Sequence, residues 1–215
     1  MKNNIRLLLP LLILGLMSSA CSPGGSSTPV QFSYTAVPIR TDIPTVSSGS
    51  NPSSVPTVPP AAAGLRLTSP AFADNGPIPQ KYTCDASSIS PQIQFSGIPT
   101  VAQSLALTLQ DPDAPRGVFV HWVIYNMPPT LSGLSEDVPK HAGVTGVGTQ
   151  GLNGAGLAGY TGPCPPAGKA HHYIFTLYAL DLKPTLPEGL NADSLKAAMQ
   201  GHILAQAQWV GLYQK

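Results

Sequence analysis

From residue 65 to the C-terminus, short apolar stretches alternate with turns rich in proline and glycine. The stretches are too short for ordinary helices, and β-branched and aromatic residues recur in them, which is typical of strands. We expect strands at residues 65–68, 92–95, 104–110, 119–127, 171–182 and 208–213. Proline or glycine punctuates nearly every gap between them, as at residues 97–99 and 126–129.

Only one stretch has the signals of a helix. Asn191 is a good N-cap residue, and helix formers follow it over residues 192–200. Within that stretch Leu195, Ala198 and Met199 fall on one side. Many short strands with so little helix favour a mainly β fold, and specifically a β-sandwich.

The first 20 residues have the pattern of a secretory signal peptide. A positively charged start precedes an apolar run over residues 7–17 that is too short to span a bilayer. The segment ends in small residues before Cys21, which resembles a bacterial lipoprotein box, although that pattern prefers Leu, Val or Ile where Ser18 stands. We expect lipidation at Cys21, which would place the protein in the bacterial cell envelope as a membrane-anchored lipoprotein on the periplasmic or cell-surface side. The alternative is an ordinary signal peptide in which Cys21 is incidental.

The next segment has the composition of a linker. Pro, Ser, Thr, Gly and Val dominate it, with almost no charges and no sustained hydrophobic period, so it cannot build a core. Proline-rich chain is stiff and extended, which suits a tether that holds a domain away from a membrane. The chain therefore divides into a signal peptide (1–20), a lipidated cysteine with a Pro/Ser/Thr-rich disordered linker (21–64) and a folded domain (65–215).

Charge and cysteine content narrow the chemistry of the folded domain. The 215-residue chain has a net charge of +1 and only 10% charged residues, so it offers no basic surface for nucleic acid. Cys84 and Cys164 would meet an oxidising compartment after export, where a disulfide is possible; the alternative is two small buried thiols. No Cys-x-x-Cys or His-x-x-x-His spacing suggests zinc, and we expect neither a metal nor a cofactor.

An acidic turn precedes the strand at 119–127. In Asp-Pro-Asp-Ala-Pro at residues 111–115, the two prolines fix φ and make the turn stiff. His121 then begins a long apolar run, so the turn and the histidine together suggest one wall of a pocket. Strand alternation predicts that His121 shares a face with Phe119, Val123 and Tyr125.

A second block has the same form. Gly-Tyr-Thr-Gly-Pro-Cys-Pro-Pro at residues 159–166 is followed by a strand that begins at His171. Alternation places His171, Tyr173, Phe175 and Leu177 on one face of that strand. Each of the two histidines therefore stands at the end of an apolar strand face, beside a loop that contains proline.

Taken together, the two blocks resemble the phosphatidylethanolamine-binding protein family, in its bacterial Raf-kinase-inhibitor-like branch. The motifs are Asp-Pro-Asp-Ala-Pro…His-Trp at 111–122 and Gly-Tyr-x-Gly-Pro-x-Pro-Pro…His-x-Tyr-x-Phe at 159–175, and the similarity covers essentially the whole folded domain. Ala86 replaces a glycine of the family pattern, and Phe95 stands where this branch often has Trp. The resemblance implies an antiparallel β-sandwich with a few short flanking helices.

The resemblance also implies a small pocket for phosphate, acetate or a phospholipid head group. By motif position its ligand-binding residues would be Asp111, His121, Pro163, Pro165, His171 and Tyr173, with Asp113 and Tyr160 in support. Imidazole, tyrosine and backbone N–H groups are donors that suit a phosphate. The Asp111 carboxylate would orient a histidine, keep it protonated, or face the ammonium of a zwitterionic head group.

These expectations favour a binding protein rather than an enzyme. We expect an envelope-anchored protein that binds a small phosphorylated or anionic ligand and modulates a partner protein of unknown identity. One alternative is an inhibitor of a protease or kinase that acts through surface loops, as the family name suggests. A less favoured alternative is a hydrolase that uses the Asp/His pocket. The sequence has no Gly-x-Ser-x-Gly motif and no clearly placed nucleophile, although Cys164 is close in sequence.

Overall fold

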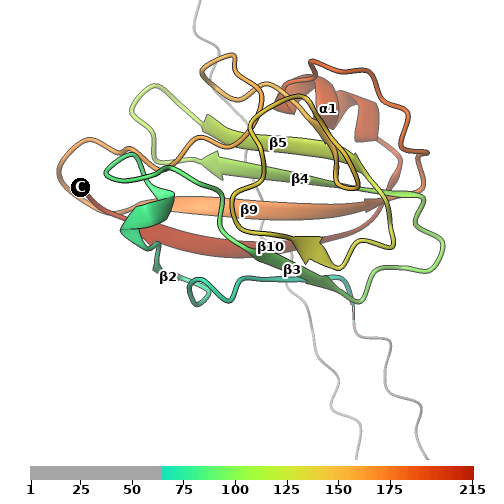
Figure 1. The fold of residues 1–215 in the computed structure, drawn as a ribbon, viewed down its shortest axis with the longest axis horizontal. Coiled ribbons are helices and arrows are strands. Elements are labelled where there is room, and N and C mark those ends of the chain that lie inside the picture. The colour runs from blue at the N-terminus through green and yellow to red at the C-terminus, as the bar shows by residue number, and fades with distance from the viewer. Residues whose placement is uncertain (1–63) are drawn as a thin grey trace, which may run out of the picture. The chain divides into compact units, whose positions relative to one another are not determined.

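The computed structural model describes residues 64–215, which form two β-sheets packed face to face (Figure 1). The larger sheet has the order β2-β10-β9-β4-β5-β8-β7 and the smaller one the order β1-β3-β6. The strands are β1 (Arg66–Thr68), β2 (Gly76–Pro77), β3 (Ile93–Ser96), β4 (Ser104–Asp111), β5 (Phe119–Met127), β6 (Gly133–Leu134), β7 (Gly143–Val144), β8 (Gly148–Gln150), β9 (His171–Leu180) and β10 (Ile203–Tyr213); the helices are the 3-10 helix η1 (Gln80–Tyr82) and α1 (Ala192–Met199). The predicted signal peptide and Cys21 lie outside the described residues.

The mainly β fold is confirmed, and each of the six expected strands is present. The bounds of β5 coincide with the expected range, whereas β10 begins at Ile203 instead of residue 208. Four strands of two or three residues (β2, β6, β7 and β8) were not expected, because such short pieces carry no periodic pattern. Every pairing is antiparallel except that of β2 with β10.

The main core lies between the two sheets. Leu67 of β1 and Phe95 of β3 pack there against side chains from the central strands of the larger sheet, including Trp122 and Phe175. The other face of the larger sheet is covered by α1, whose Leu195 and Met199 pack with residues of β4, β5 and β9. This helix begins as expected at the Asn191 cap, whose side-chain Oδ1 accepts from the Ser194 backbone N–H at 2.9 Å.

A β-bulge in β5 corrects one expectation from the sequence. The register of β4 with β5 passes from Leu109↔Trp122 to Gln110↔Val120, so His121 is the extra residue of the bulge. Val123 and Tyr125 face α1, but the His121 ring stacks edge-on with Tyr173 on the opposite face of the sheet. The prediction that His121 shares a face with Val123 and Tyr125 was therefore wrong, because alternation holds only where no bulge intervenes.

Candidate functional site

A cavity of about 350 Å³ opens where the two sequence motifs meet. Its walls come from the loop after β4, the start of β5, the loop before β9 and the start of β9. The lining residues are Asp111, Ala114, Pro115, Arg116, Gly117, Val118, Phe119, His121, Thr161, Gly162, Cys164, Pro165, Pro166 and His171. The structure thus brings Asp111, His121, Pro165 and His171 of the expected set together around one cavity.

The innermost pair of the site is Asp111 with His171. His171 Nδ1 lies 2.8 Å from Asp111 Oδ2, and both side chains are at most 5% exposed. The other carboxylate oxygen, Asp111 Oδ1, accepts from the Asp113 backbone N–H at 2.8 Å. An ionised carboxylate can only accept, so His171 Nδ1 carries the proton and Nε2 is the ring nitrogen left for a ligand.

His121 is held by the backbone of the facing loop. Its Nδ1 donates to the Thr161 carbonyl at 2.8 Å, and its own carbonyl accepts from the Thr161 N–H at 2.9 Å. Burial lowers the pKa of His121, against a smaller opposing effect of the Thr161 carbonyl and the Asp111 carboxylate. Near neutral pH the ring is therefore uncharged, and its Nε2 offers a lone pair.

Tyr173 lies behind His121 with its ring centroid 5.2 Å from that of the histidine. Its hydroxyl is buried and has no hydrogen-bond partner among the described residues. Burial, followed by the charge of nearby Asp111, raises the pKa of Tyr173, so the hydroxyl stays protonated. Tyr173 is not among the residues that line the cavity, so this expected site residue supports His121 from behind instead of facing the cavity.

The loop at 159–166 is fixed from behind by the segment around η1. The Tyr160 hydroxyl donates to the Tyr82 carbonyl at 2.8 Å, and the Gly162 N–H donates to Ser88 Oγ at 2.9 Å. A Cβ at Gly162 would stand 2.6 Å from the Tyr82 carbonyl oxygen, so this close approach requires glycine. Tyr160 and Pro163 therefore support the wall without lining the cavity.

Asp113 also lies outside the cavity lining. Its Oδ2 accepts from both the backbone N–H and the Nδ1 of His172, each at 2.8 Å, on the exposed side of β9. These hydrogen bonds, with the backbone donor contributing most, hold the pKa of Asp113 below its usual range. Asp113 joins the acidic turn to β9, and it supports the site through the position of Asp111.

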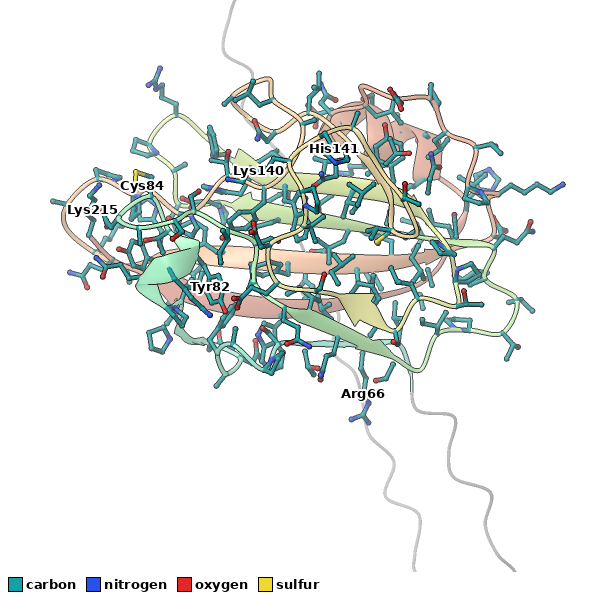
Figure 2. The ribbon with its side chains drawn as sticks, in the orientation of Figure 1. Arg66, Tyr82, Cys84, Lys140, His141 and Lys215 are labelled. Atoms are coloured by element: carbon teal, nitrogen blue, oxygen red, sulfur yellow. A yellow bond between two sulfur atoms is a disulfide. The ribbon has the colours of Figure 1, made fainter. Side chains whose placement is uncertain are left out.

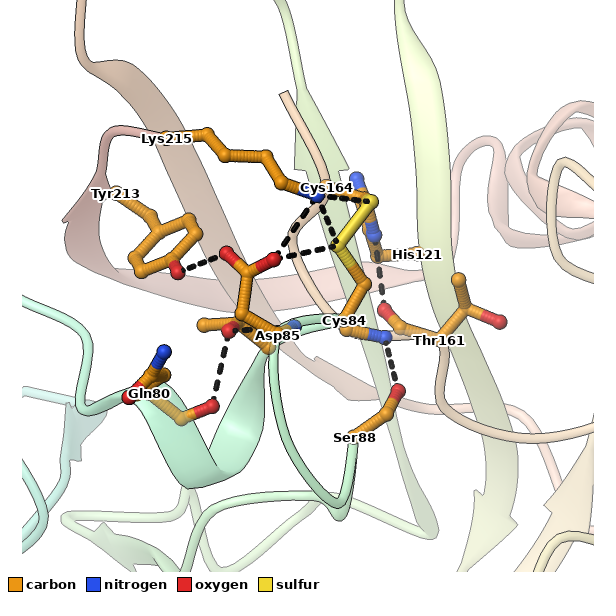
Figure 3. Close-up of a disulfide and its surroundings, with 11 residues drawn as sticks. Gln80, Cys84, Asp85, Ser88, His121, Thr161, Cys164, Tyr213 and Lys215 are labelled. Carbon is orange, nitrogen blue, oxygen red and sulfur yellow. Dashed lines mark hydrogen bonds and ion pairs between the residues drawn. A yellow bond between two sulfur atoms is a disulfide. The ribbon is translucent and has the colours of Figure 1, made fainter. Parts of the chain in front are cut away.

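The structure joins Cys84 and Cys164 by a disulfide, which was one of the two alternatives left open by the sequence. Figure 2 shows Cys84 and Lys215 at the same end of the domain, beside the C-terminus. In the close-up of Figure 3, Lys215 reaches over the disulfide, with Nζ 3.6 Å from Cys84 Sγ and 3.8 Å from Cys164 Sγ. The disulfide covalently links the η1 segment to the cavity wall.

Arg116 is a residue of the site that was not expected from the sequence. Arg116 lines the cavity with Val118 and Phe119, and it is the cation of that lining. Its position directly after the proline-rich turn at 111–115 was the available signal, but the direction of an exposed loop cannot be read from local sequence. The rim of the cavity is thus partly apolar and partly cationic.

Two kinds of feature are absent from the described residues. Residues 64–215 contain no group of three or more His, Cys, Asp or Glu side chains arranged to hold a metal ion. Within the same range, no helix has both the length and the hydropathy of a membrane span.

Fold and cavity together define a two-sheet β-sandwich protein with a small cavity, lined by both apolar and polar side chains, at the ends of β4, β5 and β9. Residues 68–214 match the family model described as phosphatidylethanolamine-binding protein. The chain belongs to this family, as the resemblance of its two motifs predicted. Among curated relatives, a UPF0098 protein of Methanothermobacter thermautotrophicus is 46% identical over 151 residues, which span 70% of this chain and 99% of the relative. A UPF0098 protein of Chlamydia pneumoniae is 44% identical over 156 residues, with the same coverage.

Solved structures agree with this assignment. A putative phosphatidylethanolamine-binding protein homolog from Chlamydia trachomatis superimposes with a TM-score of 0.65 at 42% identity, over 71% of this chain and 98% of that one. The E. coli protein YbcL, described as a member of the mammalian family, also gives a TM-score of 0.65, at 30% identity over 71% of this chain and 99% of its own. The family and its fold are therefore established for this chain.

Proposed function

We propose that this chain is an envelope-anchored binding protein whose cavity accepts the anionic part of a small ligand, such as a phosphate or a phospholipid head group. The observation that carries the proposal is the group of ring nitrogens around the cavity. His171 is oriented by Asp111, and His121 is oriented by Thr161, so each ring has Nε2 free for a ligand. Arg116 adds a positive charge at the rim.

The Asp111 carboxylate is compatible with an anion in this cavity. Both of its oxygens are already engaged, one by His171 and the other by the Asp113 N–H. A carboxylate paired in this way has no free oxygen directed at a ligand, and it fixes the orientation of the His171 ring. Anchoring to the envelope through a lipid on Cys21 is the other part of the proposal, and it rests on the N-terminal sequence alone.

The hydrolase alternative has little support in the site. Cys164 was the thiol nearest to the histidines in sequence, and in the disulfide it is not available as a nucleophile. An inhibitory role towards a protease or kinase would use surface loops, and no particular loop favours it. Palmitate labelling that is lost in Cys21→Ala would support the membrane anchor, and equal labelling of both chains would exclude it.

Replacing His121 tests the anion site. We expect His121→Ala to weaken phosphate binding by about tenfold or more, because a hydrogen bond to a charged group contributes about 1.5–3 kcal/mol. Titration calorimetry with phosphate and with phosphoethanolamine measures the effect and separates a bare anion from a head group. The control is His202→Ala, which removes an exposed histidine paired with Asp181. Equal affinity of wild type and His121→Ala would exclude the assignment.

The lowered pKa of His121 predicts a pH dependence. Its Nε2 can donate to an anion only after protonation, so binding of an anion takes up a proton and raises the pKa in the complex. Affinity should therefore rise as pH falls from about 8 to about 5.5, by up to about tenfold per unit for one proton. Sulfate is a suitable probe because its own charge is constant over that range.

The pH profile for sulfate also distinguishes His121 from the other ionisable groups of the cavity. Asp111, His171 and Arg116 also line it. We expect His121→Asn to flatten the pH profile for sulfate and to abolish the proton uptake seen by calorimetry in two buffers. A profile of unchanged slope in this variant would assign the proton to another group and contradict the role of His121.

A further inference from the structure

The disulfide lies where it can react. Cys84 and Cys164 are both exposed, and Cys164 is part of the cavity lining whereas Cys84 is not. A thiol that enters the cavity therefore meets Cys164. In thiol–disulfide exchange a thiolate attacks one sulfur and the other sulfur leaves. Since only Cys164 lines the cavity, a thiol that enters it can bond to Cys164, and Cys84 is then the leaving sulfur.

The charges around the two sulfurs reinforce the asymmetry. On the surface side, the Asp85 carboxylate is 4.0 Å from Cys84 Sγ but is paired with Lys215 Nζ at 2.9 Å, so the two charges largely cancel for an approaching thiolate. On the cavity side Arg116 is the lining cation, and it attracts an anionic thiol towards Cys164. Electrostatics and access thus favour the same target sulfur.

The leaving sulfur has a cation beside it. Lys215 Nζ lies beside both sulfurs, 3.6 Å from Cys84 Sγ and 3.8 Å from Cys164 Sγ, and it is held in place by Asp85 Oδ1 at 2.9 Å. A neighbouring ammonium stabilises a thiolate, which makes the sulfur a better leaving group. Figure 3 shows Lys215, Asp85 and Tyr213 gathered around the disulfide.

We propose that the Cys84–Cys164 disulfide is a thiol–disulfide exchange site that small anionic thiols open from the cavity. The thiolate of the incoming molecule bonds to Cys164 Sγ, the Cys84–Cys164 bond breaks, and its electron pair remains on Cys84 as a thiolate beside Lys215. A second thiolate then attacks the bound sulfur, which releases a small-molecule disulfide and the Cys164 thiolate. This chemistry does not depend on phosphate binding, so the calorimetric results for sulfate and phosphate leave it unaffected.

The test compares two thiols of opposite charge, 2-mercaptoethanesulfonate and cysteamine. The full chain is used with Cys21→Ser, which leaves only the two cysteines of the disulfide. The rate at which each thiol opens the Cys84–Cys164 disulfide is measured at equal thiolate concentration. It is then divided by the rate at which the same thiol reacts with a small neutral disulfide, which corrects for the intrinsic reactivity of the thiol. We expect the anionic thiol to be faster by about tenfold on this scale. A ratio at or below one overturns the proposal.

Mass spectrometry identifies the sulfur attacked. After acid quenching and labelling with N-ethylmaleimide, tryptic peptides separate Cys84 from Cys164, because Arg116 and Lys140 lie between them. We expect the mixed disulfide on Cys164 and the maleimide label on Cys84. The reverse pattern, or equal adducts on the two cysteines, contradicts attack from the cavity.

Two variants separate the attraction of the anionic thiol by Arg116 from the stabilisation of the Cys84 thiolate by Lys215. Arg116→Gln should reduce the preference for the anionic thiol to near one, whereas Lys215→Met should slow both thiols to a similar extent and keep the preference. Lys183→Met is the matched control, because Lys183 lies beyond the far end of β9 from the cavity. If Lys183→Met slows opening as much as Lys215→Met does, the contact of Lys215 with the sulfurs has no role.

Discussion

Replacing both cysteines, as Cys84→Ser with Cys164→Ser, is expected to lower the free energy of unfolding by about 4 kcal/mol. The disulfide joins residues separated by 80 positions, and in the chain-entropy model a loop of that length restricts the unfolded chain by about this amount. Urea unfolding of wild type and double variant under non-reducing conditions measures the difference.

The cysteine outside the disulfide serves as the control for that measurement. Cys21→Ser alone should leave the urea midpoint unchanged, because the disulfide joins Cys84 to Cys164 and does not involve Cys21. A loss of less than about 1 kcal/mol in the double variant would contradict the expected effect and would mean that the hydrogen bonds around the disulfide hold the loop without it. The bond from the Cys84 N–H to the Pro163 carbonyl, at 3.0 Å, is the first of these.

Asp111→Ala is expected to have an effect of similar size, about 2–4 kcal/mol, because the carboxylate is a buried acceptor for two donors and each donor left unpaired costs about 1–3 kcal/mol. His171 would keep a buried Nδ1–H with no acceptor, and the Asp113 N–H would lose its partner as well. Urea unfolding above about pH 7, where unfolded histidine is mostly neutral, measures the loss.

The chain contains a matched control for this prediction two residues away. Asp113 pairs with His172 at 2.8 Å, the same separation as Asp111 with His171, but those side chains are 33% and 53% exposed. Water screens an exposed pair, so Asp113→Ala should cost about 1 kcal/mol or less. Equal losses in the two variants would show that burial does not strengthen the Asp111–His171 pair.

Local sequence signals were enough for most elements of this fold. Strands such as β5 and β9 are long apolar runs, and α1 follows a capping residue, so their positions depend on neighbours in the chain. The pieces that were missed, including β2 and β6, have two residues each and exist because a longer partner strand pairs with them. Their hydrogen bonds are made with strands distant in the chain, and such pairing produces no periodic pattern of hydrophobic residues in the sequence.

The candidate site likewise has parts that the sequence predicts and parts that depend on the tertiary structure. Both motifs and their histidines could be identified from the sequence, because proline and glycine restrict the backbone locally. The bulge at His121 could not be identified, because it depends on the register between β4 and β5. Arg116 was missed for a related reason, since the fold of the loop determines whether an exposed side chain turns to the cavity.

By itself, the sequence determined a β-rich domain, its two pocket motifs and an N-terminal segment with the pattern of a lipoprotein signal. The tertiary structure decided that His171 pairs with Asp111 across 60 residues and that Cys84 is bonded to Cys164 across 80. It also decided that the Tyr173 hydroxyl has no hydrogen-bond partner among residues 64–215. The physical reason is that backbone restriction and hydrophobic period act between near neighbours in the chain, whereas a pocket is made by side chains that only the packing of distant strands brings together.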